Sequence, residues 1–155
     1  MKWITRQRPK IDRVACPWLI ARFIDQEPQF LFVPPDQVLP QAHAAGATPY
    51  DVPGVELTHD GPLCSFDALL KKYTLTDPSF QELAVIVRGA DTARLDLAPQ
   101  CAGLLAISLG LSHNFPDDHE MLRHGFVVND ALYAWLKFTR DEKHDWNPQK
   151  LAGKS

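Results

Sequence analysis

Two short segments of the sequence carry residue types that bind metal ions. The first, "GVELTHDG", contains Glu56 and His59, and the second, "PDDHEMLRH", contains Asp118 and His119. Imidazole and carboxylate groups drawn from separate loops suit a divalent cation such as zinc, iron or manganese. Neither segment is a complete motif, because Arg123 stands where a second histidine would share the helix face of His119. The predicted ligands are Glu56, His59, Asp91, Asp118 and His119; solvated loops and helix caps are the alternative interpretation.

Three arginines are candidates for binding a small oxyanion. Arg13 stands just before an expected helix, and Arg88 and Arg94 belong to "VRGADTARLD", where Gly89 allows a sharp turn. Guanidinium groups and free N–H groups at a helix start bind tetrahedral anions through charge-assisted hydrogen bonds. The sequence therefore predicts an oxyanion site at Arg13, Arg88 and Arg94. An ion pair of Asp12 with Arg13 and a salt-bridged turn are the structural alternatives.

Cys16 lies directly before Pro17, in "KIDRVACPWLIARFIDQ". At a helix cap the backbone N–H groups would lower the pKa of its thiol and activate it, whereas its apolar neighbours would raise that pKa. We favour a buried structural thiol over a reactive one. The three cysteines are widely separated and form no Cys-x-x-Cys pair, so neither a disulfide framework nor a thiolate zinc cage is indicated.

Composition limits the class of protein. The chain has 155 residues, of which 45% are hydrophobic and 23% charged, as in an ordinary globular domain. A net charge of −3 argues against direct nucleic-acid binding. No window approaches the roughly 18 apolar residues of a membrane span, and the first residues do not form a signal sequence. We expect a cytoplasmic protein that does not bind membranes.

The elements that position these residues are predicted from periodicity and caps. Short strands are expected at residues 3–5 and in "QFLFVP", and a helix is expected from Pro17 to about Asp25. Residues 34–62 are rich in proline and are expected to form an ordered loop region. Ser65 is expected to cap one helix, and Asp77 with Pro78 to start another.

The second half of the chain is predicted to be mainly helical. The segment "LAPQCAGLLAISLGLS" is the most apolar one and predicts a central buried helix. Acidic residues start a further helix after Pro116, which Gly125 is expected to divide in two, leaving His124 at a helix end. The fold class is α+β: a single, mainly helical domain over residues 3–139, with a few short strands in its N-terminal third. Residues 140–155 are expected to be a frayed tail.

Five segments in the same order resemble the C-terminal domain of the chromate resistance protein ChrB. They are "DRVACPWLIARFID", "PGVELTHDG", "CSFDALL", "VRGADTARLDLAPQ" and "DDHEMLRHGFVVNDALYAWL". Full-length members carry an additional N-terminal region and are associated with chromate-responsive regulation of an efflux operon. The resemblance implies a stand-alone resistance domain whose family-like segments supply the following polar positions: Asp12, Arg13, Cys16, Glu56, His59, Arg88, Asp91, Arg94, Asp118 and His119.

Three functional hypotheses follow. The leading one is a chromate-resistance-type domain that binds a metal ion, a small oxyanion such as chromate, or both, in a pocket of loop and helix-terminus residues. The second is a metal-dependent enzyme in which a His/carboxylate site keeps one position open for water. The third is a regulatory module that acts with a separate DNA-binding partner. Thiol reduction of chromate by Cys16 ranks below these, because three scattered thiols supply few electrons. A protein partner and a homo-oligomer both remain open.

Overall fold

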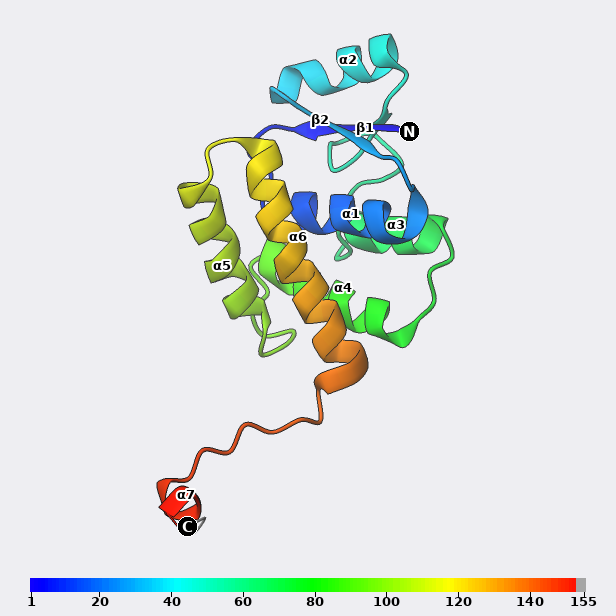
Figure 1. Cartoon of the computed structure of the whole chain (residues 1–155). Helices are drawn as coiled ribbons and strands as arrows, with labels where there is room; N and C mark the ends of the chain where they lie inside the picture. The colour runs from blue at the N-terminus through cyan, green and yellow to red at the C-terminus, as the bar shows by residue number, and fades with distance from the viewer. Residues whose placement is uncertain (153–155) are drawn as a thin grey trace.

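A computed structural model of the chain describes residues 1–152, which form a small parallel sheet and seven α-helices (Figure 1). The strands are β1 (Lys2–Arg6), β2 (Gln29–Val33) and β3 (Thr48–Pro49), in the order β2-β1-β3. Both pairings are parallel. The middle strand is the buried one, as expected for a strand with neighbours on both edges. The two strands predicted from the sequence are confirmed.

Helix α1 (Asp12–Leu19) follows β1 and continues as the π-helical segment η1 (Ile20–Ile24). The predicted start at Pro17 is wrong, because the helix begins five residues earlier and contains the proline. Cys16 therefore lies inside the helix and not at its cap. Seven of the eight residues of α1 are buried, so tertiary packing outweighs the cost of a proline within the helix.

The predicted loop region, residues 34–62, contains a helix that the sequence analysis missed. After the short 3-10 turn η2 (Pro35–Gln37), α2 (Val38–Ala45) packs against β1 and ends at Gly46, whose φ of 61° is left-handed. Val38 and Ala42 of this helix share a small apolar cluster with Ile4. From residue 50 to residue 64 the chain has no regular element, only two isolated bridges.

Helices α3 (Ser65–Lys72) and α4 (Pro78–Asp91) confirm the two predicted helices in this part of the chain. Asp77 caps α4 by accepting the Ser79 N–H at 2.8 Å, with Pro78 at the first helical position, as predicted. The cap position of α3 is Cys64 and not Ser65.

Helices α5 (Cys101–Asn114) and α6 (Asp118–Ala134) pack against each other, and the π-helical segment η3 (Trp135–Thr139) extends α6. The apolar α5 was predicted to be central, but it lies at the surface with one face exposed (Figure 1). The predicted break at Gly125 is also wrong. A Cβ on Gly125 would lie 2.5 Å from the Val14 side chain, so this glycine serves the close contact of α6 with α1.

Arg8, which follows β1, connects this strand by hydrogen bonds to the junction of α5 and α6. Its guanidinium donates to the Ser112 and Phe115 carbonyl oxygens and to the Asp118 carboxylate, whose other oxygen accepts the Arg8 backbone N–H at 3.0 Å. The main core lies between the helices and is lined by Trp3, Trp18 and Phe66 among others. A mainly helical α+β domain, as predicted, is confirmed.

Beyond η3 the chain leads away from the helices and ends in α7 (Pro148–Ala152) (Figure 1). The side chains of residues 140–146 are exposed. The frayed tail over residues 140–155 stays a prediction, and residues 153–155 lie outside the described part of the chain. No helix among residues 1–152 is long and apolar enough to cross a membrane.

Candidate functional site

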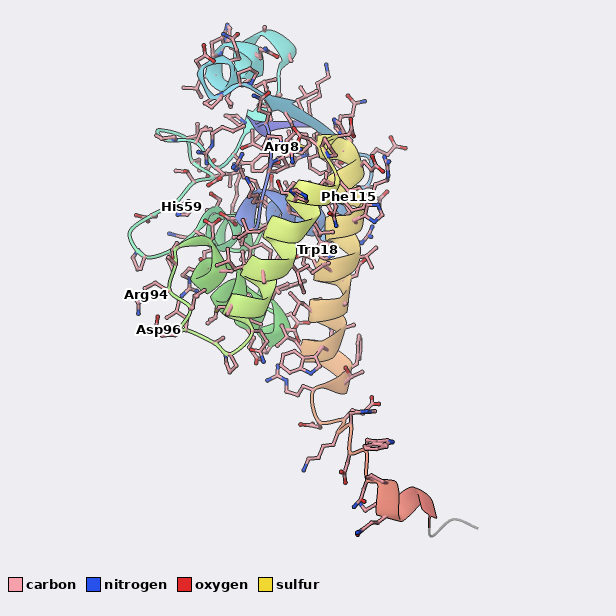
Figure 2. The ribbon with its side chains drawn as sticks, turned by 90° about the vertical axis from the view of Figure 1, so that its left-hand side faces the viewer. Arg8, Trp18, His59, Arg94, Asp96 and Phe115 are labelled. Carbon is pink, nitrogen blue, oxygen red and sulfur yellow. The ribbon has the colours of Figure 1, made fainter. Side chains whose placement is uncertain are left out.

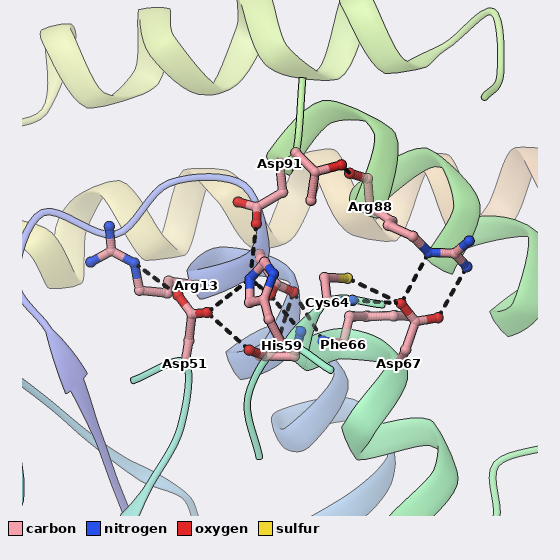
Figure 3. Close-up of polar contacts among 12 residues, drawn as sticks. Arg13, Asp51, His59, Cys64, Phe66, Asp67, Arg88 and Asp91 are labelled. Atoms are coloured by element: carbon pink, nitrogen blue, oxygen red, sulfur yellow. Dashed lines mark hydrogen bonds and ion pairs between the residues drawn. The ribbon is translucent and has the colours of Figure 1, made fainter. Parts of the chain in front are cut away.

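Three carboxylates converge on one histidine nitrogen (Figure 3). The Nε2 atom of His59 lies 3.2 Å from an Asp51 oxygen, 3.2 Å from an Asp91 oxygen and 3.5 Å from an Asp12 oxygen. A ring nitrogen carries at most one proton, so it can donate a good hydrogen bond to only one of the three. A single N–H group therefore does not account for three carboxylates at this nitrogen.

Three separate parts of the chain bring this cluster together. Asp12 is the first residue of α1, Asp91 is the last residue of α4, and Asp51 and His59 lie in the irregular segment after β3. Two backbone outliers occur here: Asp51 has a φ of 52°, and Ile11, a β-branched residue, has a φ of 45°. Such conformations cost free energy and tend to occur at functional sites.

Asp12 is fully buried and accepts hydrogen bonds at both carboxylate oxygens. The N–H groups of Ser65 and Phe66, at the start of α3, donate to it at 2.8 and 3.0 Å, and the Cys16 thiol donates at 3.3 Å. The carboxylate thus caps a helix to which it does not belong and sits where the helix dipole favours negative charge. This capping fixes the carboxylate in place beside His59.

Asp51 is buried as well and links the cluster to two arginines. One oxygen accepts the Ser65 hydroxyl at 2.9 Å, and the other lies 2.9 Å from Arg6 and 3.3 Å from Arg13. Three carboxylates therefore face two guanidinium groups, and one negative charge remains for His59 or for another cation to balance.

The electrostatics follow from this excess of carboxylates. Hydrogen bonding to Asp12 and the charges of all three carboxylates raise the pKa of His59 from 6.5 to about 9. Burial, together with the Asp12 and Asp51 charges, raises the pKa of Asp91 to about 6, and burial likewise raises the pKa of Asp51. The site thus holds positive charge at His59 in the absence of any other cation.

The same geometry offers a donor set for a metal ion. One ligand atom each from Asp12, His59 and Asp91 lies within 4.8 Å of the other two, and no other group of three or more His, Cys, Asp or Glu residues within residues 1–152 does so. One imidazole nitrogen with carboxylate oxygens is a donor set used for zinc, iron and manganese. The residues present therefore fit a divalent cation.

Two buried polar atoms beside Asp51 have no hydrogen-bond partner among the described residues. They are the hydroxyl of Tyr50, the preceding residue, and Nε of Arg6, whose Nη2 pairs with the Asp51 carboxylate. Buried polar groups are normally paired, with protein or with ordered water. These two atoms are exceptions to that rule, and both belong to residues adjoining or contacting Asp51.

Comparison with known proteins identifies the family. The model of the family described as "ChrB, C-terminal domain" matches residues 3–136. The chain belongs to this family. Protein ChrB of Cupriavidus metallidurans is 33% identical over 140 residues, which cover 90% of this chain and 42% of that protein. The chain thus spans less than half the length of this curated relative of the ChrB family. No solved structure matches it. The family expected from the sequence is confirmed.

Only two of the five predicted metal ligands of this ChrB domain lie at the cluster, His59 and Asp91. Glu56 is exposed and pairs with Lys72, and Asp118 pairs with Arg8. The ring of His119 packs against Phe32 of β2, 5.2 Å between centroids. The second histidine segment therefore does not contribute to the cluster.

The three predicted oxyanion-binding arginines are not brought together either, because each pairs with a different carboxylate. Arg13 contacts Asp51, and Arg88 binds both oxygens of Asp67 at 3.1 Å. Arg94 pairs with Asp96 on an exposed turn. Figure 2 shows Arg94 and Asp96 at the outer edge of the molecule, apart from His59.

Cys16 is fully buried and lies one helical turn after Asp12. Burial, followed by the charge of Asp12, raises the pKa of its thiol well above the usual value. The thiol that donates to Asp12 is the protonated form, which is a poor nucleophile. This placement favours the structural interpretation of the cysteine.

Sequence reasoning missed Asp12 and Asp51 as members of the site. The sequence marks Asp12 as a partner of Arg13 and as a family-like polar position, but not as a metal ligand. Asp51 lies two residues after β3, and Arg6 ends the neighbouring β1. Residues that follow parallel strands gather at the carboxyl edge of the sheet, where α/β proteins bind ligands. The position of Asp51 at this edge of the sheet can be predicted only if Thr48–Pro49 is recognised as a strand, and a strand of two residues leaves no pattern in the sequence.

Proposed function

We propose that this ChrB-family domain binds a divalent metal ion through His59, Asp12 and Asp91, with Asp51 beside them. The convergence of three carboxylates on His59 Nε2 carries the proposal. A divalent cation can bind Asp12, His59 and Asp91 together, whereas a single proton on the imidazole can be shared with only one carboxylate. Zinc, iron and manganese are the metals that match an imidazole and carboxylate donor set.

Elemental analysis of protein purified without chelator and without metal-affinity resin tests this proposal. The proposal expects about one metal ion per chain. His59→Ala and Asp91→Ala should each reduce that occupancy at least tenfold. His119→Ala and Asp118→Ala are matched controls, because they remove the same residue types away from the cluster and should leave occupancy unchanged. A folded protein that stays metal-free after incubation with all three metals contradicts the proposal.

A small oxyanion such as chromate or sulfate is expected to bind at the open position of the bound metal. Support comes from the pairing of all three predicted arginines with carboxylates, which leaves no arginine cluster for an anion. Calorimetric titration with chromate and with sulfate should therefore give heat for metal-loaded protein and none for metal-free protein. Equal heats for the two forms contradict this part of the proposal.

A metal-dependent enzyme is the second candidate function, because a groove of about 770 Å³ adjoins the loop of the cluster. Thr58 and Asp60, the neighbours of His59, line it, as do Cys64 and Asp67, whereas the proposed metal ligands themselves lie beside the groove and do not line it. This volume is within the usual range for small-molecule sites. Hydrolysis of aryl phosphates and carboxylic esters by metal-loaded protein is the test; the hydrolytic version fails if no activity depends on both the metal and His59.

We further propose that the domain acts in the cytoplasm and does not bind DNA directly, so that any regulatory role requires a separate DNA-binding partner. The net charge of −3 supports the part of this proposal that concerns DNA, since non-specific DNA binding depends on a basic surface. A gel-shift experiment at low salt should show no retardation of duplex DNA by the domain alone.

A further inference from the structure

Asp67 and Arg88 form an ion pair beside the His59 cluster without belonging to it (Figure 3). The Nε and Nη2 atoms of Arg88 donate to different oxygens of Asp67, each at 3.1 Å. The side chains of Arg88 and Asp67 are 20% and 11% exposed. Two parallel hydrogen bonds between a planar guanidinium and a carboxylate fix the orientation of both groups as well as their distance. The pair therefore holds the helices that carry it in one mutual arrangement.

Asp67 attaches this pair to the start of α3. One of its carboxylate oxygens accepts the Cys64 backbone N–H at 2.9 Å and the Cys64 thiol at 3.3 Å. Because Cys64 is the cap position of α3, Asp67 closes the capping box of its own helix. The carboxylate that binds Arg88 is thus itself fixed to the first turn of α3.

The same turn of α3 holds two of the three carboxylates at His59. Asp12 accepts the Ser65 and Phe66 N–H groups at 2.8 and 3.0 Å. Asp51 accepts the Ser65 hydroxyl at 2.9 Å. The first turn of α3 is therefore the common support of the cluster, and the third carboxylate, on α4, has to be placed relative to it.

Asp91 is that third carboxylate, and it is the last residue of α4. The end of a helix carries partial negative charge, so the helix itself does not favour a carboxylate there. Arg88 lies three residues earlier, on the adjoining surface of the helix. Its carbonyl oxygen also accepts the Thr92 N–H at 3.0 Å and the Thr92 hydroxyl at 2.7 Å. The turn that presents Asp91 to His59 is thus the turn that Arg88 connects to α3.

Gly89, in the same turn, packs against α5. An added Cβ would lie 2.4 Å from the Cys101 sulfur, so the two helices are in close contact here. Apolar packing limits the distance between helices but is non-directional. A two-bond ion pair, in contrast, defines the rotation of the turn about the helix axis. The rotation decides where Asp91 points, and Arg88 is the residue placed to set it.

We propose that Asp67 and Arg88 are positioning residues for the His59 cluster. Their ion pair sets the last turn of α4 against the first turn of α3, and so places the Asp91 carboxylate at His59 Nε2. For metal binding, this inference rests on the proposed function, in which Asp91 is a ligand. The pair itself supplies no ligand and acts only through Asp91.

The zinc affinity of Arg88→Gln tests the proposal, because charge and positioning predict opposite changes. Loss of a positive charge near a cation site favours cation binding by Coulomb's law. If Arg88 positions Asp91, the variant should instead bind zinc at least tenfold more weakly, as when a metal ligand loses its hydrogen-bonded support. Competition with a chromophoric chelator measures the dissociation constant. An Arg88→Gln variant that binds zinc as tightly as the wild type, or more tightly, overturns the proposal.

Arg94→Gln is the matched control for charge. It removes the same side chain just beyond the end of α4, from an exposed pair with Asp96. The zinc affinity of this variant should equal that of the wild type or exceed it. A loss as large as that of Arg88→Gln would show that any arginine near the cluster has this effect, and would overturn the assignment of Arg88.

A double-mutant cycle separates positioning from a general loss of structure. Because Arg88 acts through Asp91, Arg88→Gln should change the zinc affinity of an Asp91→Ala protein by less than about twofold. A merely structural role would lower the affinity equally in both backgrounds. That result contradicts the proposal.

Crystal structures of the metal-free wild type and Arg88→Lys test the positioning without any metal. In the wild type an Asp91 oxygen lies 3.2 Å from His59 Nε2. Lysine keeps the positive charge but lacks the planar fork, so the last turn of α4 should rotate and Asp91 should move out of hydrogen-bond distance of His59. An unchanged contact overturns the proposal. If the wild type binds no zinc but the contact is lost in Arg88→Lys, the proposed metal site fails and the positioning role of the pair stands.

Discussion

The carboxylate of Asp12 accepts hydrogen bonds from the Ser65 and Phe66 backbone N–H groups, and so satisfies two of the four N–H groups that α3 leaves free at its start. It also faces His59. A residue that caps a helix is held rigidly, and a rigid carboxylate is a better metal ligand than a mobile one. The stabilising and the binding roles of Asp12 therefore arise from the same contacts.

Asp12→Asn should reduce the free energy of unfolding by about 2–4 kcal/mol. Asparagine has the same shape as aspartate, but an NH2 group replaces one of the two carboxylate oxygens. This donor would face another donor, either a backbone N–H group or the Cys16 thiol, and that hydrogen bond would be lost. Urea denaturation measures the loss. Asp96→Asn is the matched control, since Asp96 is exposed and pairs only with Arg94; its change should stay within about 0.5 kcal/mol. Equal stability of the two variants would show that the cap contributes little.

Metal affinity should depend on pH through His59. Its folded pKa is about 9, so a metal ion must displace a proton below that pH, and the apparent affinity should rise about tenfold per pH unit between roughly pH 6.5 and 9. The stability of the metal-free protein should change with pH in the opposite direction to the metal affinity. Protonated His59 contributes to the free energy of unfolding below pH 6.5, and this contribution is lost as pH rises through about 9.

Calorimetric metal titrations across that pH range measure the slope. His119→Ala should keep it, because that ring packs against Phe32 away from the cluster. An affinity that does not change between pH 6.5 and 9 would mean that His59 releases no proton when the metal binds.

The local sequence was enough to select His59 and Asp91, but not Asp51. Histidine among loop carboxylates is a recognisable pattern, whereas Asp51 in "PYDVPG" has no neighbour that marks it as a ligand. Its position depends on β3, a strand of two residues, and on a left-handed φ that aspartate adopts less readily than glycine. Asp118 and His119 were selected because they are adjacent in the sequence. Adjacent residues need not point toward the same site, and neither of these side chains contacts His59.

At the scale of the elements, the sequence predicted caps and glycines correctly only where their contacts lie within the same segment of the chain. Asp77 and Pro78 start α4 as predicted, because this cap is made entirely within its own segment. The rule that proline occupies the first turn of a helix failed at Pro17. This proline lies inside α1, and the packing of the buried helix stabilises the helical conformation on both sides of it. Gly125 failed as a break for a related reason, since its neighbour is Val14 of another helix.

Gly125→Ala should therefore destabilise the protein by about 1–3 kcal/mol, the usual cost of overpacking. The added methyl group would clash with Val14, and either α6 or α1 must shift. Chemical denaturation of dilute protein measures the change. Gly103→Ala is the control on α5, where the methyl group contacts nothing and stability should stay equal or rise. A Gly125→Ala variant as stable as the wild type would show that the α1 and α6 contact is looser than the structure indicates.

At the scale of the whole molecule, the composition and the helical periods predicted the α+β class and most of the helices, because these depend on patterns within single segments. The arrangement of the segments was not predictable in the same way. Helix α5 is the most apolar segment but lies at the surface, and hydropathy alone does not distinguish a central helix from one with an exposed face. The His59 cluster likewise needs three segments, distant in the sequence, to meet.

That convergence gives the metal a measurable effect on global stability. A ligand that binds only the folded state at 100 times its dissociation constant adds about 2.7 kcal/mol to the free energy of unfolding. Urea denaturation with and without the metal identified by elemental analysis should show this increment for the wild type and for His119→Ala, and none for His59→Ala. Hydrogen exchange should slow in residues 11–16, 50–60 and 88–92 together, because one ion joins all three segments. An equal increment in His59→Ala would place the metal elsewhere, and protection confined to one segment would mean that the ligands do not act as a single site.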